Sequence, residues 1–146
     1  MRAVIQRVHE AKVRVLDQVV GAVGVGYLIL LGVSKDDLTQ DVSYLAQRIL
    51  SLRLFPREDQ DFSLDIREIQ GEILVVSQFT LYGSTDKGRR PNFGEAAKAE
   101  AAQSLYQSFV DELRQSGLRI ATGTFGAHMD VALTNNGPVT LILDSH

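Results

Sequence analysis

The sequence predicts an α+β domain in which a curved, antiparallel-rich sheet or barrel is covered by two main helices. Two observations support this fold class: alternating, strand-like patterns dominate both ends of the chain, and two long helical patterns lie between them. The chain has 146 residues, 45% of them hydrophobic, and shows no linker, repeat or low-complexity segment. Because this length is sufficient for a buried core, we expect a single domain over residues 1–146.

The first 33 residues are expected to form strands. Residues 11–16 alternate between apolar and polar side chains, which is typical of a strand with one solvent-facing side. Asp17 and Gln18 predict a tight turn into a second strand at residues 19–25. The apolar run that ends at Val33 predicts a buried third strand.

A helix is predicted next, because apolar side chains recur at spacings of four and three residues from Leu38 to Leu52. Residues 34–37 are expected to cap this helix and to supply negative charge at its start. Pro56 and the polar residues 57–61 then predict a surface loop.

The second half of the chain is expected to hold an apolar strand at residues 72–81 and a second helix. Asn92, as N-cap, and Glu95, three residues later, predict a capping box at the start of that helix. Gly117 predicts its end. Alternating patterns then predict three short strands, at residues 118–122, 128–134 and 139–144.

The composition excludes several kinds of chemistry. The chain has no cysteine, so a thiolate nucleophile, a disulfide framework and a zinc-thiolate site are all excluded. The three histidines, His9, His128 and His146, are too few and too scattered to predict an all-histidine metal site. Neither kind of metal site is therefore expected, and nothing else in the sequence implies a metal or an organic cofactor.

The charge and hydropathy patterns indicate a cytoplasmic protein without a membrane segment. The longest apolar run, residues 25–33, is about half of what spans a bilayer. Arg7 interrupts the segment in which a signal peptide would need a continuous apolar stretch. The net charge of −3 also argues against a protein whose whole surface binds nucleic acid.

The segment Asn135, Asn136, Gly137, Pro138 lies between two predicted strands. Asn-Gly between apolar runs favours a hairpin turn. Pro138, however, has no N–H for a strand ladder and restricts the residue before it. A Gly-Pro pair at this place is better suited to presenting backbone groups outward, and its peptide bond could be cis or trans.

Polar side chains follow a buried strand at Ser77, Gln78, Phe79 and Thr80. If the strand continues, Gln78 and Thr80 share one face and the other two share the opposite face. A hydroxyl here could act as a nucleophile, but no histidine or lysine lies nearby in the sequence to serve as its base. The same hydroxyls could simply satisfy backbone groups at the strand end.

Three further sets of ionisable residues are candidates for a functional role. Lys87, Arg89 and Arg90 enter the predicted second helix, where a helix N-terminus flanked by cations suits a phosphate, although short charge clusters are usually solvated loops. Arg7 stands within an apolar strand and needs a partner if it points inward. His128 is expected to face outward, which argues against a catalytic histidine.

Four segments together resemble the D-aminoacyl-tRNA deacylase (D-tyrosyl-tRNA deacylase) family, and the likeness runs from the first residue to the last strand. They are MRAVIQRV at the N-terminus, SQFTL at 77–81, GRRPNF at 88–93 and TNNGPVT at 134–140. The resemblance implies a homodimeric editing hydrolase. Such an enzyme cleaves the ester that joins a D-amino acid, or glycine mischarged on tRNA(Ala), to the tRNA 3′ end, and spares L-aminoacyl-tRNA.

The resemblance also implies roles for single residues. Gly137 and Pro138, followed by Val139, would form a Gly-cisPro motif that enters the pocket of the partner subunit and rejects L-amino acids. Arg7 would brace the carbonyls of that motif, and Met129 would help to lock it. The remaining implied residues are the catalytic set Ser77, Gln78, Phe79 and Thr80, and the tRNA-binding set Lys87, Arg89 and Arg90.

Two mechanisms stay open for the ester cleavage. Thr80 could attack the ester as a nucleophile, or the site could orient the ester while the ribose 2′-OH activates water. We favour the second, because the sequence offers no evident base for Thr80. The rival function is a noncatalytic RNA-end or nucleotide-binding module that uses the 87–90 loop and Phe93, and a plain oligomeric scaffold is a third.

The net charge of the chain is compatible with the 3′ end of an aminoacyl-tRNA as its partner. A charge of −3 disfavours broad binding of a duplex, but one acylated 3′ end requires only a local basic patch.

Overall fold

Strand β1 (Arg2–Val15) is the centre of the sheet, because it pairs antiparallel with three other strands. Its first half lies between β3 (Gly26–Gly32) and the end of β8 (Asp130–Asp144). Its second half lies between β2 (Gln18–Val23) and the start of β8. The computed structural model that shows this arrangement describes all of residues 1–146.

The sheet continues from β3 through two parallel strands, β6 (Glu72–Ser77) and β7 (Ile120–Thr122). Its outer strands approach each other: a Cβ on Gly21 of β2 would lie 2.4 Å from the carbonyl oxygen of Thr122 in β7. The sheet thus curls into a nearly closed barrel, and glycine at position 21 leaves room for the close approach of β2 and β7. The predicted barrel-like sheet is confirmed.

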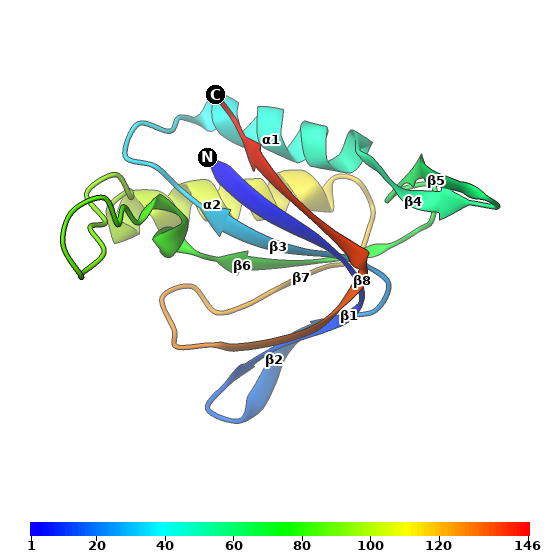
Figure 1. The fold of residues 1–146 in the computed structure, drawn as a ribbon, viewed down its shortest axis with the longest axis horizontal. Helices are drawn as coiled ribbons and strands as arrows, with labels where there is room; N and C mark the ends of the chain where they lie inside the picture. The colour runs from blue at the N-terminus through cyan, green and yellow to red at the C-terminus, as the bar shows by residue number, and fades with distance from the viewer.

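Helices α1 (Thr39–Ser51) and α2 (Ala99–Arg114) lie together on one face of the sheet (Figure 1). Their apolar stripes, which include Leu45 and Phe109, are buried with strand side chains in a cluster of 21 residues. A second cluster of seven residues, with Val8 and Leu74, fills the opposite face of the sheet. The α+β class with two covering helices is therefore confirmed. No helix of the chain is long and apolar enough to cross a membrane.

Two expectations in the middle of the chain are wrong. The stretch expected as a surface loop contains a hairpin of β4 (Arg53–Arg57) and β5 (Gln60–Asp65), with Pro56 inside β4. Pro56 fits there because it is not one of the paired residues of this small two-stranded sheet. The strand expected to reach residue 81 ends at Ser77, because the chain then turns into the 3₁₀ helix η1 (Phe79–Tyr82).

The expected start of the second helix is also wrong, since α2 begins at Ala99. Asn92 does not cap it: its Oδ1 accepts a hydrogen bond from the N–H of Gly94 at 2.7 Å, which closes a local turn. Glu95 forms no capping box and instead pairs with Lys35 at 3.0 Å.

The hairpin favoured by Asn-Gly does not form. The strands expected at 128–134 and 139–144 are parts of one strand, β8, which stays paired with β1 on both sides of the Asn-Gly segment.

Asp41 caps the start of α1 from within its first turn. The N–H of Leu38 donates to Asp41 Oδ2 at 2.8 Å, and Asp41 Oδ1 lies 3.1 Å from Nδ1 of His146. Burial alone would raise the pKa of Asp41, but hydrogen bonds from Leu38, Ser145 and His146 outweigh it and lower the pKa to about 2. Since an unfolded aspartate titrates near about 3.9, the ionised carboxylate stabilises the fold above that pH.

We predict that Asp41→Asn weakens the acid sensitivity of the fold. The wild-type contribution of Asp41 is lost as the pH falls from about 4 to about 2, whereas a neutral asparagine has no charge to lose. Urea unfolding midpoints at pH 7 and pH 3 measure the effect, with the exposed neighbour Asp36→Asn as the matched control. An equal loss of stability on acidification in wild type and Asp41→Asn would contradict this account.

Candidate functional site

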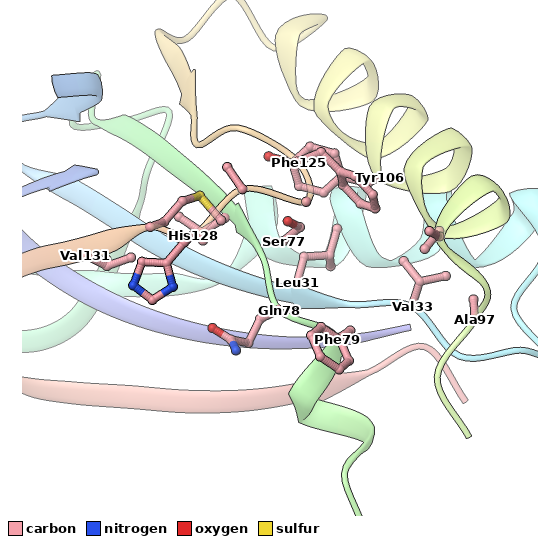
Figure 2. Close-up of a pocket in the computed structure, with 16 residues that line it drawn as sticks. Leu31, Val33, Ser77, Gln78, Phe79, Ala97, Tyr106, Phe125, His128 and Val131 are labelled. Atoms are coloured by element: carbon pink, nitrogen blue, oxygen red, sulfur yellow. The ribbon is translucent and has the colours of Figure 1, made fainter. Parts of the chain in front are cut away.

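One pocket of about 440 Å³ opens where β6 ends, between η1, the start of α2 and the segment that precedes β8 (Figure 2). Twelve of its 16 lining residues are hydrophobic. Its other lining residues are Ser77, Gln78, Gly126 and His128, so no aspartate, glutamate, lysine or arginine lines it. The pocket is therefore a largely apolar cleft with a few polar groups, the usual composition of a small-molecule site.

The end of β6 positions the first polar groups. The N–H of Gln78 donates to the carbonyl of Leu31 at 2.8 Å, which holds the chain on the sheet just before it turns into η1. Because the strand stops here, Ser77, Gln78 and Phe79 all line the pocket and do not alternate between two faces. The sequence thus predicted these three pocket residues, but with the wrong geometry.

Thr80 is the exception within this segment. It is exposed and does not line the pocket. Its hydroxyl accepts a hydrogen bond from the Gln78 side-chain amide and makes no hydrogen bond with a histidine, a lysine or a carboxylate. The structure therefore shows no base that would activate Thr80 as a nucleophile.

Tyr106 forms part of the pocket wall from α2. Its hydroxyl donates to the carbonyl of Val75 at 2.9 Å, and burial raises the pKa of Tyr106 to about 12. Its ring also lies 5.6 Å from the ring of Phe125, which lines the pocket from the segment before β8. Tyr106 thus stays protonated near neutral pH and shapes the pocket.

His128 lines the pocket, which the sequence did not predict. Figure 2 shows its imidazole at the edge of the cleft, on the side of Gln78. The side chain is exposed, as expected, but it lies at the edge of the pocket, because the residues just before β8, which begins at Asp130, form part of the pocket wall. Met129 and Val131 also line the pocket while packing against the buried cluster inside the barrel, so the core-facing expectation for these two residues is confirmed.

Gly137 and Pro138 lie in a bulge of β8, outside the pocket of their own chain. Gln6 of β1 pairs with Thr140, and Val8 pairs with Asn135, so the residues between 135 and 140 bulge out opposite one strand residue. Both members of the Gly-Pro pair are exposed, and their peptide bond is cis.

Arg7 is the strand residue opposite this bulge, and it is 7% exposed. Its Nε donates to the carbonyl of Asn136 at 3.2 Å, and its Nη1 donates to the carbonyl of Leu54 at 2.6 Å. A Cβ on Gly137, where φ is +123°, would lie 2.9 Å from Nη2 of Arg7. Glycine is therefore required here, and the guanidinium fixes the bulge through its first carbonyl.

The side chain of Asn135 holds the other end of the bulge. Its Oδ1 accepts a hydrogen bond from the N–H of Val139 at 3.2 Å, and its amide donates to Thr140 at 3.0 Å.

Lys87, Arg89 and Arg90 lie in an exposed loop that is closed by pairing of Ser84 with Asn92. None of these three cations forms an ion pair within the chain, in which nine pairs are found. Because α2 starts only at residue 99, the loop does not lead directly into a helix N-terminus. The phosphate site expected from a helix dipole is therefore wrong, and only the cluster of free cations remains.

Asp37, Asp41 and His146 bring potential metal ligands within 4.8 Å of one another, away from the pocket. Asp37 is already paired with the amino group of Met1, and Asp41 with His146. The cluster is thus satisfied by its own ion pairs.

Comparisons with known proteins find matches over nearly the whole chain. A family model described as D-Tyr-tRNA(Tyr) deacylase matches residues 4–144. A D-aminoacyl-tRNA deacylase of Thermosipho africanus is 52% identical over 145 residues, covering 99% of this chain and 97% of the relative. One of Thermus aquaticus is 53% identical, covering 99% of this chain and 95% of the relative.

Two solved structures share the fold. A c-Myc DNA unwinding element binding protein superposes with a TM-score of 0.92 at 40% identity, covering 99% of this chain and 98% of the other. A probable eukaryotic D-amino acid tRNA deacylase superposes with a TM-score of 0.85 at 20% identity, covering 98% of both chains. By its family match and its relatives, this chain belongs to the D-Tyr-tRNA(Tyr) deacylase family.

Proposed function

We propose that this chain is an editing hydrolase that cleaves the ester of D-aminoacyl-tRNA to free D-amino acid and tRNA. The observation that carries the proposal is family membership over residues 4–144, together with relatives about half identical that are D-aminoacyl-tRNA deacylases. Glycine mischarged on tRNA(Ala) belongs to the same substrate class, because glycine has no side chain that a chiral filter could reject.

The pocket supports catalysis by positioning. Water adds to the ester carbonyl, and the bond to the ribose 3′ oxygen breaks, which leaves a free amino acid and the 3′-OH of tRNA. Ser77, Gln78 and the backbone N–H groups of Phe79 and Thr80 are the groups that would hold the ester and stabilise its oxyanion. No carboxylate or lysine lines the pocket, and no hydrogen bond orients His128 at its edge, so the substrate's own 2′-OH is the group proposed to activate the water.

Backbone carbonyl groups, rather than side chains, would distinguish D-amino acids from L-amino acids. If the carbonyls of Gly137 and Pro138 stand against the substrate α-carbon, an L side chain collides with them, whereas a D-amino acid or glycine presents only hydrogen there. A fixed backbone wall rejects by steric exclusion. The hydrogen bonds from Arg7 and Asn135 support this role, because they hold the bulge in one conformation.

The wall would come from a second copy of the chain. Gly137 and Pro138 are exposed and do not line the pocket of their own chain. A homodimer in which each bulge enters the other subunit's pocket completes both sites, with Met129 of the receiving pocket helping to seat it. Arg7, which holds the carbonyl before Gly137, acts in this scheme on its own chain's motif.

A second candidate function is nucleic-acid binding without catalysis. It is favoured by the free cations Lys87, Arg89 and Arg90 and by the DNA-binding name of the solved structure that is 40% identical. In that case the Ser77–Thr80 segment and the Gly-Pro pair would only be structural.

Hydrolysis of D-Tyr-tRNA and L-Tyr-tRNA by the purified protein distinguishes the two functions. We expect loss of the D ester at catalytic protein concentration, while the L ester decays at its spontaneous rate. Binding of both tRNAs without loss of either ester would refute the hydrolase and leave the binding function.

We predict that Thr80→Ala retains deacylation within about tenfold of wild type, because the Thr80 hydroxyl has no base and alanine keeps the backbone N–H that is proposed to act. Loss of a true nucleophile costs on the order of 10³-fold or more in kcat. Single-turnover rates measure the effect, and the exposed Thr85→Ala in the adjacent loop is the matched control. A collapse of the rate with unchanged substrate binding would instead assign Thr80 as the nucleophile.

We predict that Pro138→Ala raises the ratio of L to D cleavage by about tenfold, because the substituted backbone gains freedom in φ and no longer forms a rigid wall. The readout is kcat/KM for the two Tyr-tRNA esters, with Pro56→Ala, at an exposed position of β4, as the control. Unchanged selectivity in a folded, active Pro138→Ala protein would remove the motif from chiral selection.

A further inference from the structure

Two aromatic rings stand exposed beside the pocket. Phe79 lines the pocket and is 58% exposed, and Phe93 is 37% exposed. Their rings meet edge to face, with centroids 5.0 Å apart and planes at 64°. The pair is built into the fold, because a Cβ on Gly83 would lie 2.8 Å from the ring of Phe93. Glycine at this position thus makes room for the second ring.

Phe93, the ring that lies farther from the pocket, directly follows the loop that carries Lys87, Arg89 and Arg90. Asn92, which closes the loop by pairing with Ser84, is the residue before Phe93. The loop cations have no acidic partner, and Glu95, the nearest following acid in the sequence, is paired with Lys35. The one acid within the loop, Asp86, accepts a hydrogen bond from the Ser84 hydroxyl at 2.7 Å and pairs with none of the three cations. An exposed aromatic face therefore stands next to a loop with net positive charge. This combination is the one that binds single-stranded nucleic acid, through base stacking and phosphate contacts.

We infer that Phe93, held against Phe79, is a stacking platform for the unpaired nucleotide that precedes the esterified one, and that Lys87, Arg89 and Arg90 bind its phosphates. The inference rests on the proposed function and names a further binding residue for the same substrate. The reacting nucleotide occupies the pocket, and the strand leaves past Phe79, so the next base meets the outer ring. Charge complementarity favours this occupant over an apolar protein segment.

The test compares substrates of different length. The first is the D-tyrosyl ester of adenosine, and the second is a D-tyrosylated single-stranded trinucleotide that ends in adenosine. Phe93→Leu keeps an apolar side chain against Phe79 but has no ring, and Phe93→Tyr restores the ring. Stacking is worth about 1–3 kcal/mol per base, so Phe93→Leu should lower kcat/KM on the trinucleotide at least about fivefold more than on the adenosine ester. Phe93→Tyr should recover most of this difference.

Phe62→Leu is the matched control. Phe62 is 55% exposed in β5, and Figure 1 shows that hairpin at the opposite end of the molecule from the 83–94 loop. Equal losses on both substrates in Phe93→Leu would overturn the inference, because they would mean that Phe93 only supports the position of Phe79. No loss on either substrate would overturn it as well.

Binding separates this inference from the proposed function. The affinity of the unacylated trinucleotide, measured by fluorescence anisotropy, should fall in Phe93→Leu even if neither ester is hydrolysed. That result would refute the proposed hydrolase function but support base stacking on Phe93. Replacing Lys87, Arg89 and Arg90 with alanine should weaken trinucleotide binding more at about 50 mM than at about 500 mM salt, since phosphate contacts are screened. Equal trinucleotide affinity in wild type and Phe93→Leu would overturn the platform.

Discussion

The structure depends on one buried cation at the centre of its longest strand pair. Arg7 stands opposite the place where β8 leaves its register with β1, and its guanidinium bonds two backbone carbonyls, of Asn136 and Leu54. A buried guanidinium without these acceptors would be strongly destabilising. The two features depend on each other. The carbonyl of Asn136 in the bulge accepts a hydrogen bond from the buried guanidinium, and this bond holds in place the bulge that carries Gly137. An element exposed to solvent thus gains the rigidity of the core.

The pocket likewise contains few ionisable side chains, and no aspartate, glutamate, lysine or arginine lines it. Its walls are mostly apolar side chains, and its polar groups come from a strand end and an adjacent turn, with Ser77 and Gln78 foremost. Burial raises the pKa of Tyr106 to about 12, so its hydroxyl stays protonated and uncharged near neutral pH. A site of this kind suits an activated ester, where orientation and oxyanion stabilisation supply much of the rate.

The sequence predicted what depends on local pattern. The helix over Thr39–Ser51, the fold class and the pocket segment at Ser77 follow from periodicity and from the end of an apolar run. What failed depends on distant partners. Asn-Gly at residues 136 and 137 would turn in isolation, but β1 pairs with both flanks and keeps one strand. His128 could not be assigned to the pocket, because only the folded loop before β8 brings it there.

We propose that each active site joins the pocket of one chain to the Gly137–Pro138 bulge of the other. Two variants test it: Gly137→Val disrupts the bulge against Arg7, and Ala102→Trp fills the pocket. Each homodimer should lose D-aminoacyl-tRNA deacylation. Heterodimers of the two, purified by separate tags, contain one site with an intact pocket and an intact bulge only if the bulge crosses between subunits. We expect about half of wild-type activity in the heterodimer, and an inactive heterodimer would rule out a bulge that crosses between subunits.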